Sequence, residues 1–177
     1  MVQLSELMDS SLSVLIFLAD NPQKYTYTQL REKTELAKAT LSKFLSKLQK
    51  NNLITLTKIG RNKLYQINID NYLVRRLKIL NSLAKLSFLT SLSRKHNCEF
   101  YLFGSAARGG DNTESDYDLL VLGKINKEEI IADIDKLAKK LKKEIRLQLF
   151  TASEWALMGS KDPAFYERVE KDKILIK

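Results

Sequence analysis

An uninterrupted apolar run, LLVLG at 119–123, directly follows Asp116-Tyr117-Asp118. Such a run of strand length predicts a central strand that is buried on both faces. Positions 116 and 118 are two apart, so both carboxylates project from the same face. Two like charges side by side are unfavourable unless a cation bridges them, and hard oxygen ligands suit Mg²⁺ or Mn²⁺. The sequence therefore predicts a metal site at Asp116 and Asp118, which are also the candidate catalytic residues.

A second motif lies upstream, and ten residues, 106–115, separate it from Asp116. The stretch EFYLF at 99–103 indicates a strand with buried aromatic side chains, and it breaks at Gly104-Ser105 before Ala106-Ala107-Arg108. A strand that enters a helical turn through Gly-Ser predicts a phosphate site, because the missing side chain lets backbone amides approach an anion. We therefore expect Gly104, Ser105 and Arg108 to contact the phosphates of a nucleotide.

The first half of the chain shows helical spacing and then alternation. Helices are expected at 11–21, 26–35 and 38–52, and Thr26 and Gln29 stand in the relation of a capping box at the start of the second helix. Two runs rich in β-branched residues, 53–59 and 63–69, then flank a turn at 60–62 and predict a hairpin.

Charge is concentrated in this half. Residues 1–97 hold 16 Lys and Arg against 6 Asp and Glu, whereas residues 98–177 hold 14 against 15. A basic half suggests that it contacts a polyanion. The polar face of the third expected helix and the hairpin tip carry the side chains that reach phosphates and base edges. The expected DNA-binding residues are Lys38, Thr40, Ser42, Lys43, Lys47 and Arg61.

The stretch from Thr26 to Ile69, including LSKLQKNNLI, resembles the winged-helix families of transcriptional regulators. The resemblance implies a winged helix-turn-helix domain over residues 1–70, with helix 38–50 in the major groove. It also implies that Lys58, Arg61 and Lys63 lie near DNA phosphates.

Residues 71–97 follow as a connector. The pattern over 71–95 predicts one long helix that is apolar over much of its circumference. Such a helix must be covered on more than one side, either by packing against both domains or by a homodimer contact. The domain boundary is expected inside or just after this helix, near 95–98.

The pattern Gly-Ser, ten residues, Asp-x-Asp, with SDYDLLV and FYERVEKDKILIK, resembles the minimal nucleotidyltransferases of the DNA polymerase β superfamily. The resemblance covers residues 98–177 and implies a mixed-sheet nucleotidyltransferase fold, which makes the chain α+β. It implies a nucleoside triphosphate substrate, with ATP expected, held by Gly104 and Ser105. It further implies that the two aspartates bind two metal ions and that a third carboxylate on a later strand acts as the base. Several members of that family are antitoxins, so the resemblance also implies an antitoxin-like enzyme whose partner is a HEPN-type ribonuclease toxin.

The sequence departs from this pattern on the later strand. EIRLQLFT at 144–151 places Gln148 where the third acid is expected, and glutamine can neither accept a proton nor neutralise a metal. Glu144 or Glu154 replaces the acid, or the site lacks it. Two hypotheses follow: an enzyme that transfers NMP to a protein or another hydroxyl acceptor, or a DNA-binding regulator whose second domain binds nucleotide or a partner without turnover.

The remaining expectations concern location. The chain has one cysteine, Cys98, and no secretory leader at Met1, which fits a reducing cytoplasm. The longest apolar stretch, 12–19, is far short of the ~20 residues that a membrane span needs. We therefore expect a cytoplasmic protein with no membrane contact.

Overall fold

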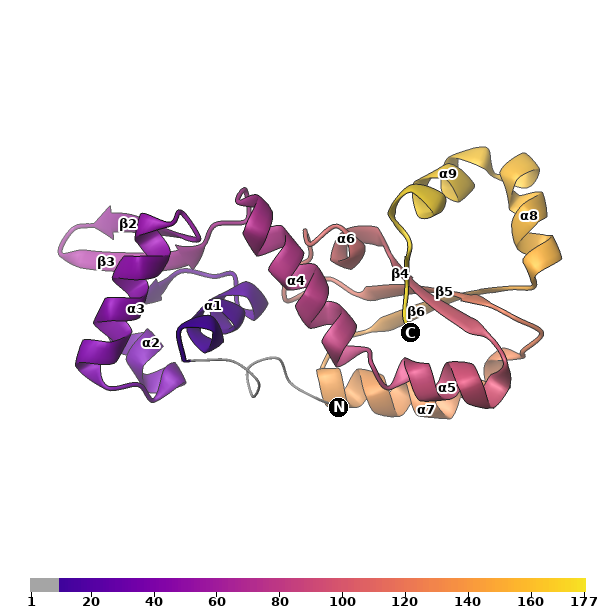
Figure 1. Cartoon of the computed structure of the whole chain (residues 1–177), viewed down its shortest axis with the longest axis horizontal. Helices are drawn as coiled ribbons and strands as arrows, with labels where there is room; N and C mark the ends of the chain where they lie inside the picture. Colours follow the sequence, from indigo (N-terminus) through magenta and orange to yellow (C-terminus); the bar gives the residue numbers. More distant parts are fainter. Residues whose placement is uncertain (1–9) are drawn as a thin grey trace. The chain divides into compact units, whose positions relative to one another are not determined.

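The computed structural model describes residues 10–177, so the first nine residues of the expected 1–70 domain lie outside it. The chain divides into two compact units, one ending at Asn81 and the other beginning at Ser82 (Figure 1). Both units combine helices with a sheet, in agreement with an α+β chain. None of the helices within 10–177 is long and apolar enough to cross a membrane.

The first unit contains three helices and a small antiparallel sheet of order β1-β3-β2. Its elements are α1 (Ser10–Asp20), β1 (Tyr25–Thr26), α2 (Tyr27–Thr34), α3 (Lys38–Lys50), β2 (Ile54–Ile59) and β3 (Asn62–Ile67). The three helices and the hairpin lie where the sequence predicts them. The two-residue strand β1, which pairs with β3 through Tyr25 and Thr26, is too short for an alternation pattern to reveal.

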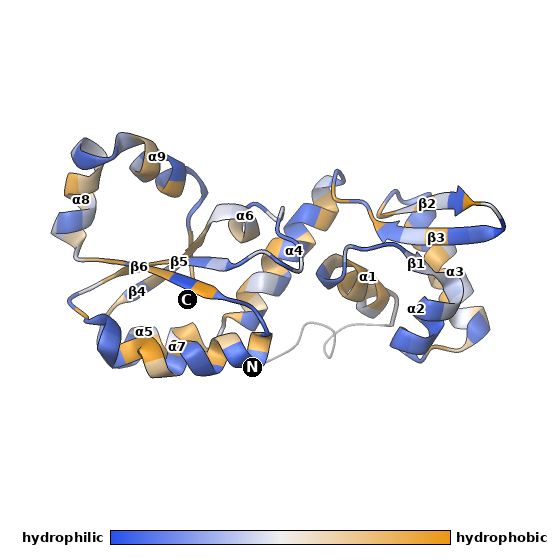
Figure 2. Ribbon diagram, turned by 180° about the vertical axis from the view of Figure 1, so that it is seen from behind, coloured by the Kyte–Doolittle hydropathy of each residue, from blue (hydrophilic) through white to orange (hydrophobic). Residues whose placement is uncertain are grey.

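Leucines at helical spacing form the core of this unit. Leu30 on α2 and Leu41 and Leu45 on α3 are fully or almost fully buried, and they pack with Val14 and Leu18 of α1. Figure 2 shows α1 mostly in the colours of apolar residues and α2 mostly polar, because α2 contributes only Leu30 as a buried residue. Hydrophobic burial thus fixes α3 with its lysine-bearing face outward.

The capping box expected at the start of α2 is confirmed. The backbone amide of Gln29 donates to Thr26 Oγ1 at 3.3 Å, and the backbone amide of Thr26 donates to Gln29 Oε1 at 2.8 Å. Replacing Thr26 with Ala is expected to lower the free energy of unfolding of this unit by about 1 kcal/mol, because a free amide at the helix start loses its acceptor. Urea denaturation followed by far-UV circular dichroism measures the change. Thr28→Ala, two residues after Thr26 and inside α2, is the matched control and should leave the midpoint of urea denaturation unchanged.

The expected single helix over 71–95 is wrong. The chain forms α4 (Tyr72–Lys85) and α5 (Leu89–His96), separated by a tight turn at 86–88. The turn is closed by short-range bonds in which the amides of Leu89 and Thr90 donate to the carbonyls of Leu86 and Ser87, at 2.9 and 3.1 Å. Periodicity cannot reveal this break, because neither Gly nor Pro marks it.

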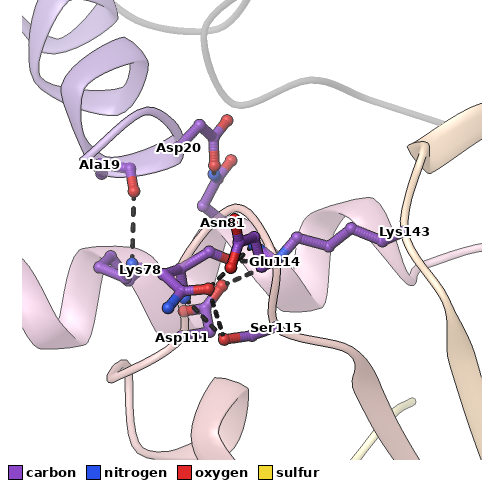
Figure 3. A network of polar contacts seen from close by, with 9 residues as sticks. Ala19, Asp20, Lys78, Asn81, Asp111, Glu114, Ser115 and Lys143 are labelled. Atoms are coloured by element: carbon purple, nitrogen blue, oxygen red, sulfur yellow. Dashed lines mark hydrogen bonds and ion pairs between the residues drawn. The ribbon is translucent and has the colours of Figure 1, made fainter. Parts of the chain in front are cut away.

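The division between the units falls within α4, earlier in the chain than the expected boundary near 95–98. The reason is the burial of α5. Leu86, Leu89 and Leu92 are 3% exposed or less, and they belong to the same hydrophobic cluster as Phe100 and Leu119 of the second sheet. Within α4, Lys78 donates to the carbonyl of Ala19 and Asn81 to Asp20 Oδ1, which anchors this part of the helix in the first unit (Figure 3).

The second unit is built on a mixed sheet of order β6-β5-β4-β7, in which β5 and β6 are parallel and the other pairs antiparallel. Its further elements are β4 (Glu99–Phe103), α6 (Gly104–Ala107), β5 (Tyr117–Leu122), α7 (Lys127–Leu141), β6 (Ile145–Phe150), α8 (Ala152–Lys161), α9 (Pro163–Asp172) and β7 (Ile174–Leu175). The apolar run predicted as a central strand is β5, which lies between β6 and β4.

Helices cover both faces of this sheet, with α5 and α7 on one side and α8 and α9 on the other (Figure 1). Tyr117, Leu119 and Val121 of β5 pack toward the first pair, and Leu120 packs with Trp155 and Val169 on the second. All these β5 residues are 2% exposed or less, which explains why the strand tolerates no polar residue after Asp118.

Candidate functional site

The Gly104-Ser105 turn and the carboxylate pair meet at one end of the second sheet. Phe103, the last residue of β4, pairs with Asp118 of β5, so the chain reverses at Gly104 directly beside this carboxylate. Gly104 adopts a φ of 74°, and a Cβ at this position would overlap Asp118 Oδ2 and lie 3.2 Å from its Cγ. Only glycine satisfies both the backbone conformation and the close approach.

The two aspartates flank the buried Tyr117, so both carboxylates lie on the opposite side of the strand, half-buried. Burial raises the pKa of the Asp118 carboxyl above its usual value; the Arg146 guanidinium opposes this shift, and the negative charge of Asp116 adds to it. The aspartates are therefore electrostatically coupled, as the two-residue spacing predicts.

Arg146 of β6 is the partner of this carboxylate pair. It lies opposite Asp118 in the parallel register, and its Nη2 forms an ion pair with Asp116 Oδ2 at 2.7 Å. Its Nε also lies 3.4 Å from Glu144 Oε1. The sequence does not reveal this position of Arg146, because the register of β6 on β5 is not a local property of the chain.

The structure places Gln148 and the two glutamates considered as replacements for the third acid in different surroundings. Gln148 pairs with Leu120, one step along the strand from Asp118. Glu154 is engaged elsewhere, because its carboxylate accepts from the backbone amide and hydroxyl of Thr151 at the start of α8, at 2.8 and 2.9 Å. These hydrogen bonds hold the pKa of Glu154 below its usual value. Glu144 is the remaining candidate, and the Arg146 guanidinium contacts it.

Arg108, expected to contact phosphate, follows α6 and is half exposed. Its Nη1 forms an ion pair with Asp172 Oδ2 of α9 at 2.6 Å. The guanidinium is thus held near the carboxylate site, and Arg108 and Arg168 both contribute favourably to the charged form of Asp118. Ser105 lies half-buried beside Gly104.

The segment between the two motifs is anchored rather than loose. Lys143 Nζ lies 3.2 Å from Asp111 Oδ2 and donates to the carbonyl of Asn112 at 2.9 Å (Figure 3). The same ammonium lies 5.0 Å from the centre of the Tyr117 ring. These contacts tie the ten-residue spacer to the start of β5 and so fix where Asp116 emerges.

The donor set decides which metal arrangement fits. Within residues 10–177 no group of three or more His, Cys, Asp or Glu side chains could hold a metal ion. Asp116 and Asp118 alone suffice for one Mg²⁺ ion, which commonly takes one or two carboxylates and completes its shell with water and substrate phosphates. The two aspartates therefore fit a divalent cation whose remaining ligands come from water and substrate phosphates.

The first unit carries a separate groove of ≈ 780 Å³. This basic groove is lined by Thr26, Tyr27, Thr28, Lys38, Ala39, Ser42, Arg61, Asn62, Lys63 and Tyr65. Its lining residues come from the starts of α2 and α3 and from the β2–β3 hairpin. The Tyr27 hydroxyl donates to the carbonyl of Lys38 at 2.7 Å and so links two of these lining residues.

The groove brings together three of the expected DNA-binding residues, namely Lys38, Ser42 and Arg61. Lys43 and Lys47 are exposed on α3 and Thr40 is half-buried, all outside the groove lining. Thr28 and Asn62 were not expected. Their only sequence signal is their place beside the capping box and in the hairpin turn, respectively.

The nucleotidyltransferase domain family matches residues 86–176, about half of the chain. The chain therefore belongs to this family, and nucleotidyl transfer is the general activity that the match supports. The matched range begins at the turn between α4 and α5, so it agrees with the placement of α5 in the second unit. No curated protein matches the chain.

Proposed function

We propose that the second unit binds a nucleoside triphosphate together with one Mg²⁺ or Mn²⁺ ion and transfers NMP to a hydroxyl acceptor. The observation that carries this proposal is the direct approach of Gly104 to Asp118, which sets a phosphate-binding turn against a carboxylate pair. ATP is the nucleotide expected. The divalent ion, when bound, would neutralise phosphate charge and make the phosphorus more electrophilic.

The roles of the chain's own residues follow from their positions. The backbone at Gly104 and Ser105 holds the terminal phosphates, and Arg108, fixed by Asp172, adds positive charge beside them. The acceptor oxygen attacks the α-phosphorus, the bond to the bridging oxygen of the β-phosphate breaks, and pyrophosphate leaves. The acceptor proton passes to a base, for which Glu144 is the available carboxylate beside Arg146.

A protein acceptor is the form of this function that the likeness to minimal nucleotidyltransferase antitoxins favours. In that form the acceptor is a HEPN-type ribonuclease toxin that the chain modifies. The test is incubation with each α-labelled nucleoside triphosphate, Mg²⁺ and candidate acceptors, with Asp118→Asn as the disabled variant. Label transfer that disappears in Asp118→Asn supports catalysis; no transfer with any of the four nucleotides contradicts it.

The second candidate function is a regulator that binds nucleotide or a partner without turnover. Arg146 favours it, because the guanidinium occupies the neighbourhood in which the family resemblance requires a third acid. Loss of a general base lowers the rate of a reaction by about 10²–10⁴-fold. Nucleotide binding without label transfer distinguishes the regulator from the enzyme.

For the first unit we propose DNA binding by a winged helix-turn-helix. Three helices followed by a hairpin, with α3 presenting its polar face and Arg61 and Lys63 at the hairpin tip, support this assignment. The basic groove contains hydroxyl and cationic side chains, which are the types that proteins use to contact DNA phosphates. Binding to DNA agrees with both candidate functions of the second unit.

A homodimer through residues 71–95 is proposed as well. Tyr72, Leu73 and Leu80 of α4 are 65%, 63% and 47% exposed, which is unusual for large apolar side chains on one helix. A two-fold arrangement would suit a DNA reader that recognises two half-sites.

A further inference from the structure

The Arg146 guanidinium lies between carboxylates at the position where a cation would be expected. Its Nη2 contacts Asp116 Oδ2 at 2.7 Å, and its Nε faces Glu144 Oε1 at 3.4 Å. The register of β6 on β5 sets Arg146 directly opposite Asp118. One positively charged group therefore contacts two acidic side chains and lies on the strand position opposite a third.

The guanidinium compensates the negative charge of the carboxylates that it contacts, as a metal ion would. A guanidinium is planar, permanently charged and rich in donors, so it can bind several carboxylate oxygens at once. Asp116 Oδ2, which a second metal ion would need, is already engaged by Nη2. A divalent ion at the same place would meet a fixed positive charge within a few ångströms and be repelled.

Beyond Arg146, the next position on the same face of β6 offers no further acid. Gln148, one step along the exposed face of β6, is neutral and pairs with Leu120 rather than Asp118. Arg108 and Arg168 add positive charge to the surroundings of Asp118, and Arg108 is held there by Asp172. Part of the negative charge that would attract a metal ion is thus already compensated by arginines.

We propose that the Arg146 guanidinium takes the place of one of the family's two metal ions, so that the site accepts a single divalent cation with its nucleotide. This inference rests on the proposed nucleotide function. It assigns to Arg146 a positioning role: the guanidinium binds Asp116 Oδ2, and the remaining carboxylate oxygens of the two aspartates hold the one ion together with the nucleotide phosphates.

The experiment counts bound Mn²⁺ by electron paramagnetic resonance, using the full chain and the non-transferable analogue α,β-methylene-ATP. The wild type is expected to bind one Mn²⁺ per chain with the analogue, and Arg146→Asp two. Gln148→Asp is the matched control, since it adds an acid to the same strand face but keeps the guanidinium, and it should still bind one. Two ions in the wild type or in Gln148→Asp would overturn the inference, as would one ion in Arg146→Asp.

A titration with Mn²⁺ alone separates this inference from the nucleotide proposal. Removing the guanidinium charge should tighten Mn²⁺ binding by about tenfold in Arg146→Asp and by less in Arg146→Gln. If the analogue binds no variant, the nucleotide proposal fails while the Mn²⁺ comparison still decides the role of Arg146. Arg146→Gln also serves if Arg146→Asp does not fold, and an affinity equal to that of the wild type would contradict the inference.

Discussion

Replacing Gly104 with Ala is expected to weaken nucleotide and Mn²⁺ binding by about 10–100-fold, the range found when a group that orients a metal ligand is lost. The added Cβ would overlap Asp118 Oδ2, so the carboxylate must rotate away from its place beside the turn. The positive φ of 74° adds a backbone cost of about 1–2 kcal/mol for a residue with a side chain. Isothermal titration with α,β-methylene-ATP measures the first effect.

Urea denaturation followed by tryptophan fluorescence measures the backbone cost as a loss of stability. The signal reports on the second unit, because Trp155 is the single tryptophan of the chain and lies in the core of that unit. The matched control is Gly110→Ala. The atom nearest to an added Cβ there is the Ser105 carbonyl oxygen at 3.9 Å, and the backbone φ is not positive. Gly110→Ala should change stability by less than about 0.5 kcal/mol and leave binding intact. Unimpaired binding by Gly104→Ala would contradict the assignment of the turn to the nucleotide site.

The combined substitution of Lys38, Arg61 and Lys63 by Ala is expected to reduce the salt dependence of DNA binding by the first unit. Each phosphate contact contributes about 0.9 to the slope of log K against log salt, so three lost contacts lower the slope by about 2.7. All three side chains line the basic groove. Fluorescence anisotropy with a labelled duplex at several salt concentrations gives the slope directly.

A charge-matched control uses three exposed lysines of the second unit, namely Lys124, Lys127 and Lys139. Their replacement by Ala removes the same net charge from the chain but lies outside the basic groove. The slope should then remain that of the wild type. Equal losses in the two triple variants would show that net charge rather than the groove drives binding, and an absence of DNA binding in the wild type would contradict the proposal.

Local patterns predicted much of the fold. The capping box at Thr26 and Gln29 depends on residues three apart, and the leucines at 41, 45 and 48 show their common face within four turns of helix. The central strand after Asp118 was visible because burial on both faces excludes polar residues from it. The turn at 86–88 was missed for the converse reason, since apolar spacing continues through it while the backbone changes direction.

The sequence alone thus determined the parts of the site that lie close together in the chain: a glycine turn at the end of one strand and two aspartates at the start of the next. Their meeting depends on the antiparallel pairing of β4 with β5, which a short connection makes natural. Only the tertiary structure placed Arg146 against Asp116. β6 reaches β5 through the crossover helix α7, and no local pattern fixes the register of two parallel strands joined in this way.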